Sequence, residues 1–289
     1  MGARRLHHCA ALRLGIASEA CLEPAMPTNA ELIQQGLFHH RQGEAALAMD
    51  RYTEVLRNDP QNADALYYVA AIACQDGQYQ QGIDLARRSL SFAPKQARAH
   101  NLIGQALHRQ GKIEDALKAF DEALACDIDF AGAYANRGNM LSELGRHTEA
   151  LSSFDRALAL DANAAADWLN RGATLHAMGR PGEAIESYDR ALALDADFGI
   201  AHFNRAGVLH ERGRFEEALA GFDRALALAP SMAQAHRGRA AALDALGRKD
   251  EARAANDKAA ALEKELADKA KKAADGDKPP ENSASQGRQ

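Results

Sequence analysis

Residues 131–164 read AGAYANRGNMLSELGRHTEALSSFDRALALDANA, and residues 165–198 repeat the pattern as AADWLNRGATLHAMGRPGEAIESYDRALALDADF. Within these two segments and on both sides of them in the sequence, glycine recurs every 34 residues, at Gly43, Gly77, Gly111, Gly145, Gly179, Gly213 and Gly247. A fixed period of this length is typical of a unit that is repeated and stacked. We number the positions of a unit from 1 to 34, and the seven units are 29–62, 63–96, 97–130, 131–164, 165–198, 199–232 and 233–266.

Each unit has the pattern of a helix pair. Apolar and small residues keep helical spacing in both halves, as at Tyr134, Gly138, Leu141, Ala150, Phe154 and Leu158. We expect the glycine at position 15 to end the first helix in the left-handed conformation. Small residues at position 20 let the two helices approach closely, as at Ala116, Ala150, Ala184 and Ala218. Proline at position 32 is expected to end the second helix, as at Pro60, Pro94 and Pro230.

Together these positions resemble the tetratricopeptide repeat (TPR), which has a large residue at position 4, as at Trp168, glycine at 8, alanine at 20, an aromatic at 24 and proline at 32. The resemblance implies an all-α fold, a right-handed α-solenoid of about seven tandem helix-turn-helix units. In this family, positions 2, 5, 6, 9, 12 and 13 of the first helix line a concave groove that binds proteins or peptides. The repeats also resemble those of bacterial O-GlcNAc transferase-like proteins, although the glycosyltransferase domain is absent.

The segments outside the repeats have different patterns. Residues 1–28 are expected to form a flexible N-terminal extension, closed by a capping box of Thr28 and Glu31 at the start of the first helix. The last unit departs from the pattern, which fits a capping helix that continues over residues 267–274. Residues 275–289, which are polar and contain two prolines, are expected to be a disordered tail.

Composition disfavours several function classes. The 35 basic and 40 acidic residues give a net charge of −5, which lacks the positive excess that nucleic-acid binding needs. No apolar run reaches 18 residues, so no membrane span is expected. The four cysteines have no metal-type spacing. The alanine-rich, cysteine-poor repeats look bacterial, and the N-terminal residues make a poor secretory signal. We therefore expect a cytoplasmic protein, with the monomer favoured.

No pattern typical of catalysis is present at usable spacing: there is no P-loop, GxSxG, HExxH or Rossmann glycine motif. We therefore expect no enzyme activity, no cofactor and no metal site. His40, His108, His176 and His210 share position 12, where a metal site competes with a simpler interpretation as polar groove lining, which we favour. Arg137, Arg171, Arg205 and Arg239 share position 7, and we favour pairing with Asp155, Asp189 and Asp223 over an anionic ligand.

Asparagine recurs at the groove positions, and apolar or aromatic residues lie beside it. The predicted partner-binding residues are Asn101, Asn136, Asn139, Asn170, Asn204, Tyr67, Tyr68, Leu102, Leu169 and Phe203. A side-chain amide both donates and accepts, so a row of amides could bond the backbone of an extended peptide without reading its sequence. The row resembles the asparagine ladder in the repeat domain of O-GlcNAc transferases. The alternative is that unit duplication spread asparagine along the chain.

Three functions remain open at this stage. The leading hypothesis is a non-enzymatic adaptor that holds an extended peptide or a partner helix in the groove. The second is the substrate-recruiting arm of a protein O-glycosyltransferase system whose catalytic domain is on another chain or lost. The third is a structural scaffold that self-associates through its terminal units, against which the polar last unit argues.

Overall fold

The computed structural model describes residues 27–276, and their regular structure is entirely helical. The first helices of the pairs are α1 (Asn29–Arg41), α3 (Ala63–Gln75), α5 (Ala97–Arg109), α7 (Ala131–Glu143), α9 (Ala165–Ala177), α11 (Gly199–Glu211) and α13 (Ala233–Ala245). The second helices are α2 (Ala45–Asn58), α4 (Tyr79–Phe92), α6 (Ile113–Cys126), α8 (His147–Leu160), α10 (Pro181–Leu194), α12 (Phe215–Leu228) and α14 (Lys249–Gly276). Each first helix begins at the first residue of a predicted unit.

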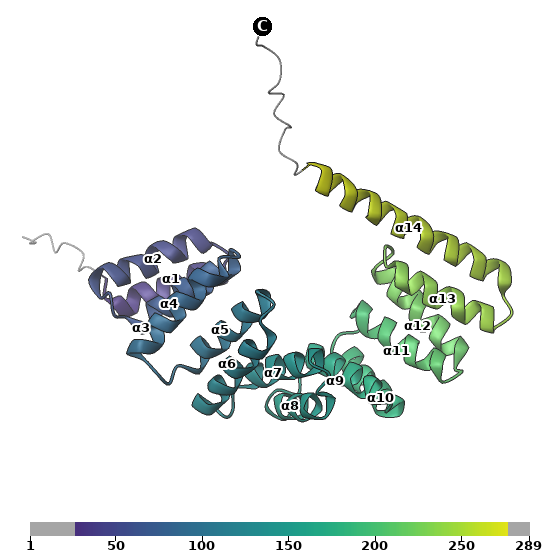
Figure 1. The fold of residues 1–289 in the computed structure, drawn as a ribbon, viewed down its shortest axis with the longest axis horizontal. Helices are drawn as coiled ribbons and strands as arrows, with labels where there is room; N and C mark the ends of the chain where they lie inside the picture. Colours follow the sequence, from purple (N-terminus) through teal and green to yellow (C-terminus); the bar gives the residue numbers. More distant parts are fainter. Residues whose placement is uncertain (1–26, 277–289) are drawn as a thin grey trace, which may run out of the picture.

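The pairs stack along a curved path (Figure 1). Each helix packs against the helices before and after it in the chain, and the first helices of neighbouring pairs also contact one another from α3 to α13. In the central pairs, α5, α7 and α9 lie on the inner side of the curve, and α6, α8 and α10 lie on the outer side. This arrangement confirms the all-α solenoid of tandem helix pairs.

The glycine of each turn has the backbone conformation that its position predicts. All seven position-15 glycines have φ between 71° and 78°, a region in which any Cβ is strained. The prolines at position 32 do not determine where the second helix ends, contrary to the sequence prediction. The second helix ends at position 30 both in units with proline, as at Phe92 before Pro94, and in units without it, as at Cys126 before Ile128.

The N-terminal end of the array matches the sequence prediction, whereas the last helix is slightly longer than predicted. The Thr28 backbone N–H donates to Glu31 Oε2 over 2.7 Å, and the Glu31 N–H donates to Thr28 Oγ1 over 3.3 Å, which confirms the capping box. Helix α14 continues to Gly276, so the predicted boundary at Ala274 falls two residues early. Almost all of the predicted N-terminal extension and tail, residues 1–26 and 277–289, lies outside the described residues.

A glycine and an aromatic ring pack against each other inside most units. A Cβ added at Gly104, Gly138 or Gly172, all at position 8, would lie 2.6–2.7 Å from the position-24 ring of the same unit. These rings belong to Phe120, Phe154 and Tyr188 and are at most 1% exposed. Only glycine therefore lets the two helices of these pairs close over the ring.

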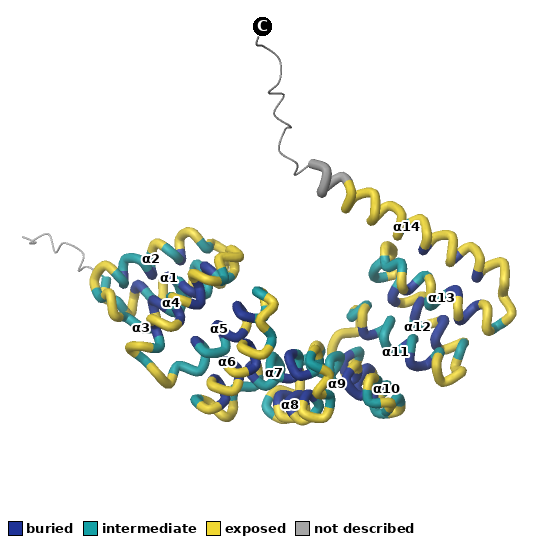
Figure 2. The backbone as a smooth tube through the Cα atoms, viewed as in Figure 1, coloured by how far each residue is buried: buried dark blue, intermediate teal, exposed yellow. Residues whose placement is uncertain are grey.

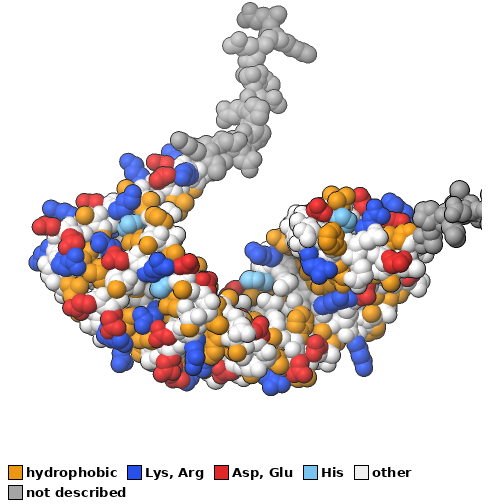
Figure 3. Space-filling view, turned by 180° about the vertical axis from the view of Figure 1, so that it is seen from behind, with side chains coloured by type: hydrophobic (Ala, Val, Ile, Leu, Met, Phe, Trp, Pro, Cys, Tyr) orange, Lys and Arg blue, Asp and Glu red, His pale blue; other side chains and the backbone are white. Residues whose placement is uncertain are grey.

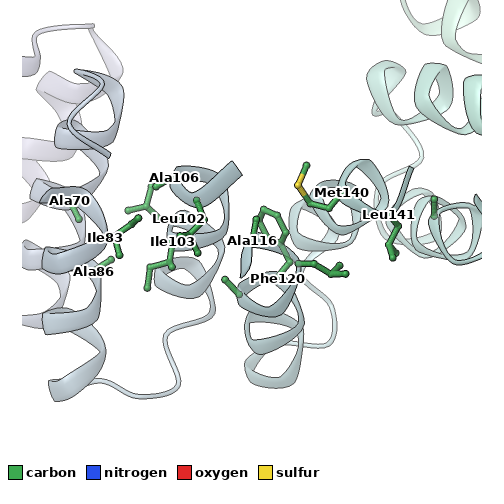
Figure 4. Close-up of a cluster of buried hydrophobic side chains, with 14 of the residues drawn as sticks. Ala70, Ile83, Ala86, Leu102, Ile103, Ala106, Ala116, Phe120, Met140 and Leu141 are labelled. Carbon is green, nitrogen blue, oxygen red and sulfur yellow. The ribbon is translucent and has the colours of Figure 1, made fainter. Parts of the chain in front are cut away.

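Buried residues recur in every helix pair, alternating along each helix with half-buried and exposed ones (Figure 2). The largest cluster runs from α3 and α4 through α5 and α6 to α7 and α8, so it crosses two boundaries between units. Figure 4 shows Ile83 of α4 facing Leu102 and Ile103 of α5, and Phe120 of α6 near Met140 and Leu141 of α7. Each unit therefore buries its apolar surface against its neighbours, as a stacked array requires.

Ion pairs also join neighbouring units. The arginine Nε at position 7 donates to the position-25 aspartate of the preceding unit over 2.6–2.7 Å, in the pairs Arg137–Asp121, Arg171–Asp155, Arg205–Asp189 and Arg239–Asp223. The interpretation of these arginines as partners of helical aspartates is confirmed, and Asp121 joins the set. Arg137 and Arg171 also donate to the buried hydroxyls of Ser153 and Ser187 over 2.8 Å.

Arg171→Met is expected to lower the free energy of unfolding by about 1–3 kcal/mol, because it leaves the buried Ser187 hydroxyl and Asp155 without their donor. Arg180, which makes an exposed bidentate pair with Glu183 in the same unit, provides the control. Arg180→Met should have a clearly smaller effect in urea unfolding followed by circular dichroism. Equal losses for the two variants would contradict the proposed role of Arg171 between the units.

The ring at position 4 makes a further contact between units. The Trp168 Nε1–H donates to the Ala162 carbonyl over 3.0 Å, and the Nε2 atoms of His202 and His236 lie 3.0 and 3.1 Å from the carbonyls of Ala196 and Pro230. Each carbonyl is at position 32 of the preceding unit. Trp168, His202 and His236 therefore bond the end of one pair to the start of the next.

Candidate functional site

A cavity of about 900 Å³ opens on the inner side of α1, α3, α5 and α7. It lies at the position that the groove pattern predicts, and five of the predicted residues line it: Tyr67, Tyr68, Leu102, Asn136 and Asn139. Figure 3 shows the hollow that the curved array encloses, with apolar and histidine side chains on its walls. We call this cavity the N-terminal groove.

A second cavity of about 420 Å³ lies between α9, α11 and α13, and Phe203 and Asn204 line it. The three remaining predicted residues, Asn101, Leu169 and Asn170, line neither cavity. Leu169 instead packs against the buried cluster that contains Leu175 and Tyr188. The predicted row of binding residues is therefore divided between two cavities.

The asparagines bond one another across the units. Asn136 Nδ2 donates to Asn101 Oδ1, and Asn170 Nδ2 donates to Asn139 Oδ1, each over 3.0 Å. All of these side chains are half-buried. Each donor amide keeps one N–H, so the two pairs hold the amides in place and leave part of their hydrogen-bonding capacity for another molecule.

Arg98 organises the aromatic wall of the N-terminal groove, and the sequence analysis did not single it out. Its guanidinium lies 4.6 Å from the centre of the Tyr67 ring, donates to Tyr68 Oη over 3.0 Å and pairs with Asp64. Burial raises the pKa of Tyr67, with Arg98 opposing the change. Because Asp64 and Arg98 share position 2 of consecutive units, their opposite charges were a signal that could have revealed the pair.

Three of the four position-12 histidines bond to position 13 of the next unit. Nε2 of His108 lies 3.0 Å from Glu143 Oε1, Nε2 of His176 lies 2.7 Å from Glu211 Oε2, and His40 bonds Gln75 over 3.1 Å. Within residues 27–271, no group of three or more potential ligands is arranged to hold a metal ion. These contacts favour the interpretation of the histidines as polar lining of the groove.

Two cysteines fall within the described residues, Cys74 and Cys126, and both are free. Cys74 lines the N-terminal groove, and burial raises the pKa of its thiol, which makes it a poor nucleophile at neutral pH. Cys9 and Cys21 lie outside the described residues. In the part of the chain that the structure describes, no helix combines the length and the apolar character that crossing a bilayer requires.

Comparison with known families identifies the repeat. Models described as tetratricopeptide repeats match residues 129–197, 169–233 and 211–271, and a TPR repeat model matches residues 104–145. Residues 38–123 match the family of anaphase-promoting complex, cyclosome, subunit 3. The chain therefore belongs to the tetratricopeptide-repeat family. Proteins of this family are generally scaffolds for protein–protein interaction.

Two curated relatives match parts of the chain. The probable UDP-N-acetylglucosamine–peptide N-acetylglucosaminyltransferase SPINDLY of Hordeum vulgare is 29% identical over 114 residues, which cover 37% of this chain and 12% of the relative. The small glutamine-rich tetratricopeptide repeat-containing protein 2 of Saccharomyces cerevisiae is 33% identical over 87 residues, covering 29% of this chain and 25% of the relative. The chain thus matches a quarter or less of each relative's length.

Solved structures share the fold at low identity. PilF of Pseudomonas aeruginosa superposes with a TM-score of 0.66 and 19% identity, covering 72% of this chain and 94% of PilF. YrrB, described as a TPR protein with an unusual peptide-binding site, gives a TM-score of 0.55 and 19% identity over 64% of this chain and 95% of YrrB. At this identity the likeness supports the fold alone.

Proposed function

We propose that this protein is a non-enzymatic adaptor whose concave face binds an extended polypeptide or a partner helix. The observation that carries the proposal is the N-terminal groove, where half-buried amides and a tyrosine wall converge on a cavity of about 900 Å³. That volume is large enough for several residues of a bound chain. The membership of a family of interaction scaffolds agrees with this use of the groove.

The lining of the groove offers two kinds of contact. Asn136 and Asn139 supply amide groups for the backbone of a peptide, while Tyr67, Leu102 and Met140 supply apolar surface for its side chains. Because Tyr68 is bonded by Arg98 and stacks on Tyr52 with ring centres 4.9 Å apart, the wall is ordered before a ligand arrives. Such preorganisation lowers the entropic cost of binding.

The double substitution of Asn136 and Asn139 by alanine is expected to weaken capture of a partner by about 5- to 150-fold, since each lost hydrogen bond contributes about 0.5–1.5 kcal/mol. Alanine at Asn163 and Asn256, which are exposed and outside the groove, is the matched control. Crosslinking mass spectrometry and titration of the captured partner measure the effect. Unchanged capture by the Asn136/Asn139 double variant, or no crosslink to the groove, would refute the proposal.

A second candidate function is the substrate-recruiting arm of a protein O-glycosyltransferase system. The partial similarity to SPINDLY favours it, since that relative is named as a peptide N-acetylglucosaminyltransferase. Sugar transfer from a nucleotide-sugar, assayed with the protein alone and together with a candidate transferase, separates the two functions. An arm should raise transfer to a captured substrate by a separate transferase, whereas a pure adaptor should leave that rate unchanged.

A further inference from the structure

Charge is unevenly distributed along the inner face of the array. In the first three units, the cavity lining includes Arg41 and Arg109 and no carboxylate. Further along, position 13 carries Glu143 and Glu211 instead. Position 13 of the concave face therefore changes from arginine in units one and three to glutamate in units four and six.

The three arginines near the groove differ in whether a carboxylate pairs with them. Arg98 is taken up by Asp64 and the tyrosine wall, so it adds little positive potential to the groove. Within residues 27–271, Arg41 and Arg109 form no ion pair, and Arg41 donates only to the Leu37 carbonyl of its own helix. Both side chains are exposed at the groove. Two guanidiniums without a carboxylate partner therefore border an apolar and amide-lined cavity.

We propose that the N-terminal groove selects an acidic linear segment, in which two or more carboxylates flank an apolar side chain. The carboxylates pair with Arg41 and Arg109, the apolar side chain lies against Tyr67, Leu102 and Met140, and the backbone bonds the amides. This inference rests on the proposed function, because it names the class of peptide that the groove takes. The two arginines that would bind the carboxylates are at position 13 of units one and three.

The chain's own N-terminal segment contains one run that fits this description, in which Glu19 and Glu23 flank Leu22, but the segment as a whole is not acidic. Arg4, Arg5 and Arg13 outnumber the two glutamates, so the net charge of residues 1–26 is positive, like that of the groove. Charge complementarity therefore favours a separate acidic partner over self-occupation.

Fluorescence anisotropy with the full chain tests the inference. The probes are three labelled 12-residue peptides of glycine and serine with one central leucine, flanked by four aspartates, four asparagines or four lysines. The aspartate peptide should bind about tenfold more tightly than the asparagine peptide, and the lysine peptide most weakly. Raising the salt concentration should reduce the preference.

The variant Arg41→Glu/Arg109→Glu should lose the preference for aspartate and bind the aspartate peptide at least about tenfold more weakly. The control is Arg87→Glu/Arg190→Glu, which makes the same charge change on the exposed outer faces of α4 and α10. It should stay within about twofold of the natural protein, and circular dichroism shows whether all variants are folded.

The outcomes separate the two proposals. Binding of the aspartate and asparagine peptides with equal affinity, lost in the Asn136/Asn139 double variant, would overturn the acidic preference and leave the adaptor function standing. Equal losses in the groove and control variants would show nonspecific attraction and overturn the inference. Absence of binding by all three peptides would overturn it as well, whereas crosslinks of a captured partner to the groove would still support the adaptor function.

Discussion

Phe154→Ala is expected to lower the free energy of unfolding by about 3–5 kcal/mol, the range found when a fully buried phenylalanine is truncated. The ring is completely buried in the cluster that joins α3 to α8, and it closes over Gly138 of its own unit. Because neighbouring units stabilise one another in a linear array, the loss should be greatest in the fourth unit and the units beside it. Urea unfolding and hydrogen exchange resolved along the chain measure both effects.

The glycine beneath the ring gives this prediction its control. Gly138→Ala should destabilise the protein by about 1–3 kcal/mol, although alanine is the better helix former, because its Cβ would lie 2.7 Å from the Phe154 ring. Gly207→Ala, also within a first helix, should stabilise the protein by about 1 kcal/mol, because a Cβ there meets nothing within 4 Å. Shifts of the same sign for the two variants would contradict the packing argument.

Alkaline unfolding should begin near pH 10 and steepen towards pH 12 because of two buried tyrosines. Burial raises the pKa of Tyr52 to about 12, with Tyr68 adding to the rise and Arg41 opposing it. Burial also raises the pKa of Tyr188 to about 12, with a contribution from Glu211. The unfolded chain loses these protons at lower pH than the folded chain, so the stability is intact below pH 10. It then falls by roughly 3 kcal/mol per tyrosine as the pH approaches 12.

Tyr52→Phe and Tyr188→Phe should each reduce this loss, and their effects should add because the residues lie in distant units. Tyr52 Oη is buried without a hydrogen-bond partner among the described residues, so Tyr52→Phe should also raise the stability at pH 7 by about 1 kcal/mol. Unfolding in urea at pH 8, 10 and 11 provides the comparison. Parallel pH profiles for the natural protein and the double variant would disprove the role of these tyrosines.

The sequence predicted the helix pairs closely because a glycine marks the turn at position 15 of every unit. The positive φ at position 15 is available to glycine at low cost, so Gly145 or Gly179 marks a turn whatever surrounds it. The pairs Arg171–Asp155 and Arg205–Asp189 were also predictable, since identical positions in identical units must make the same contact. The end of α14 was harder to place because, among the described residues, no further helix pair follows it, and a position-32 proline does not set where a second helix ends.

The site could be predicted only in part, because its geometry depends on how one unit is rotated against the next. Position numbers placed Tyr67, Leu102 and Asn136 on the groove correctly. They did not reveal that Asn101 and Asn170 are bonded to other asparagines, nor that Leu169 packs into a buried cluster. These contacts join different positions of successive units, so the repeat pattern alone does not show them.

Site-specific photocrosslinking tests the central claim, that the concave face binds a polypeptide, most directly. One photoreactive residue replaces Gln105, which is exposed in the N-terminal groove, and a second replaces Lys118, which is exposed on the outer helix α6 of the same unit. The account predicts a crosslinked polypeptide from position 105, competed by an acidic peptide, and none from position 118. Equal crosslinking at both positions, or crosslinking from 118 alone, would contradict it.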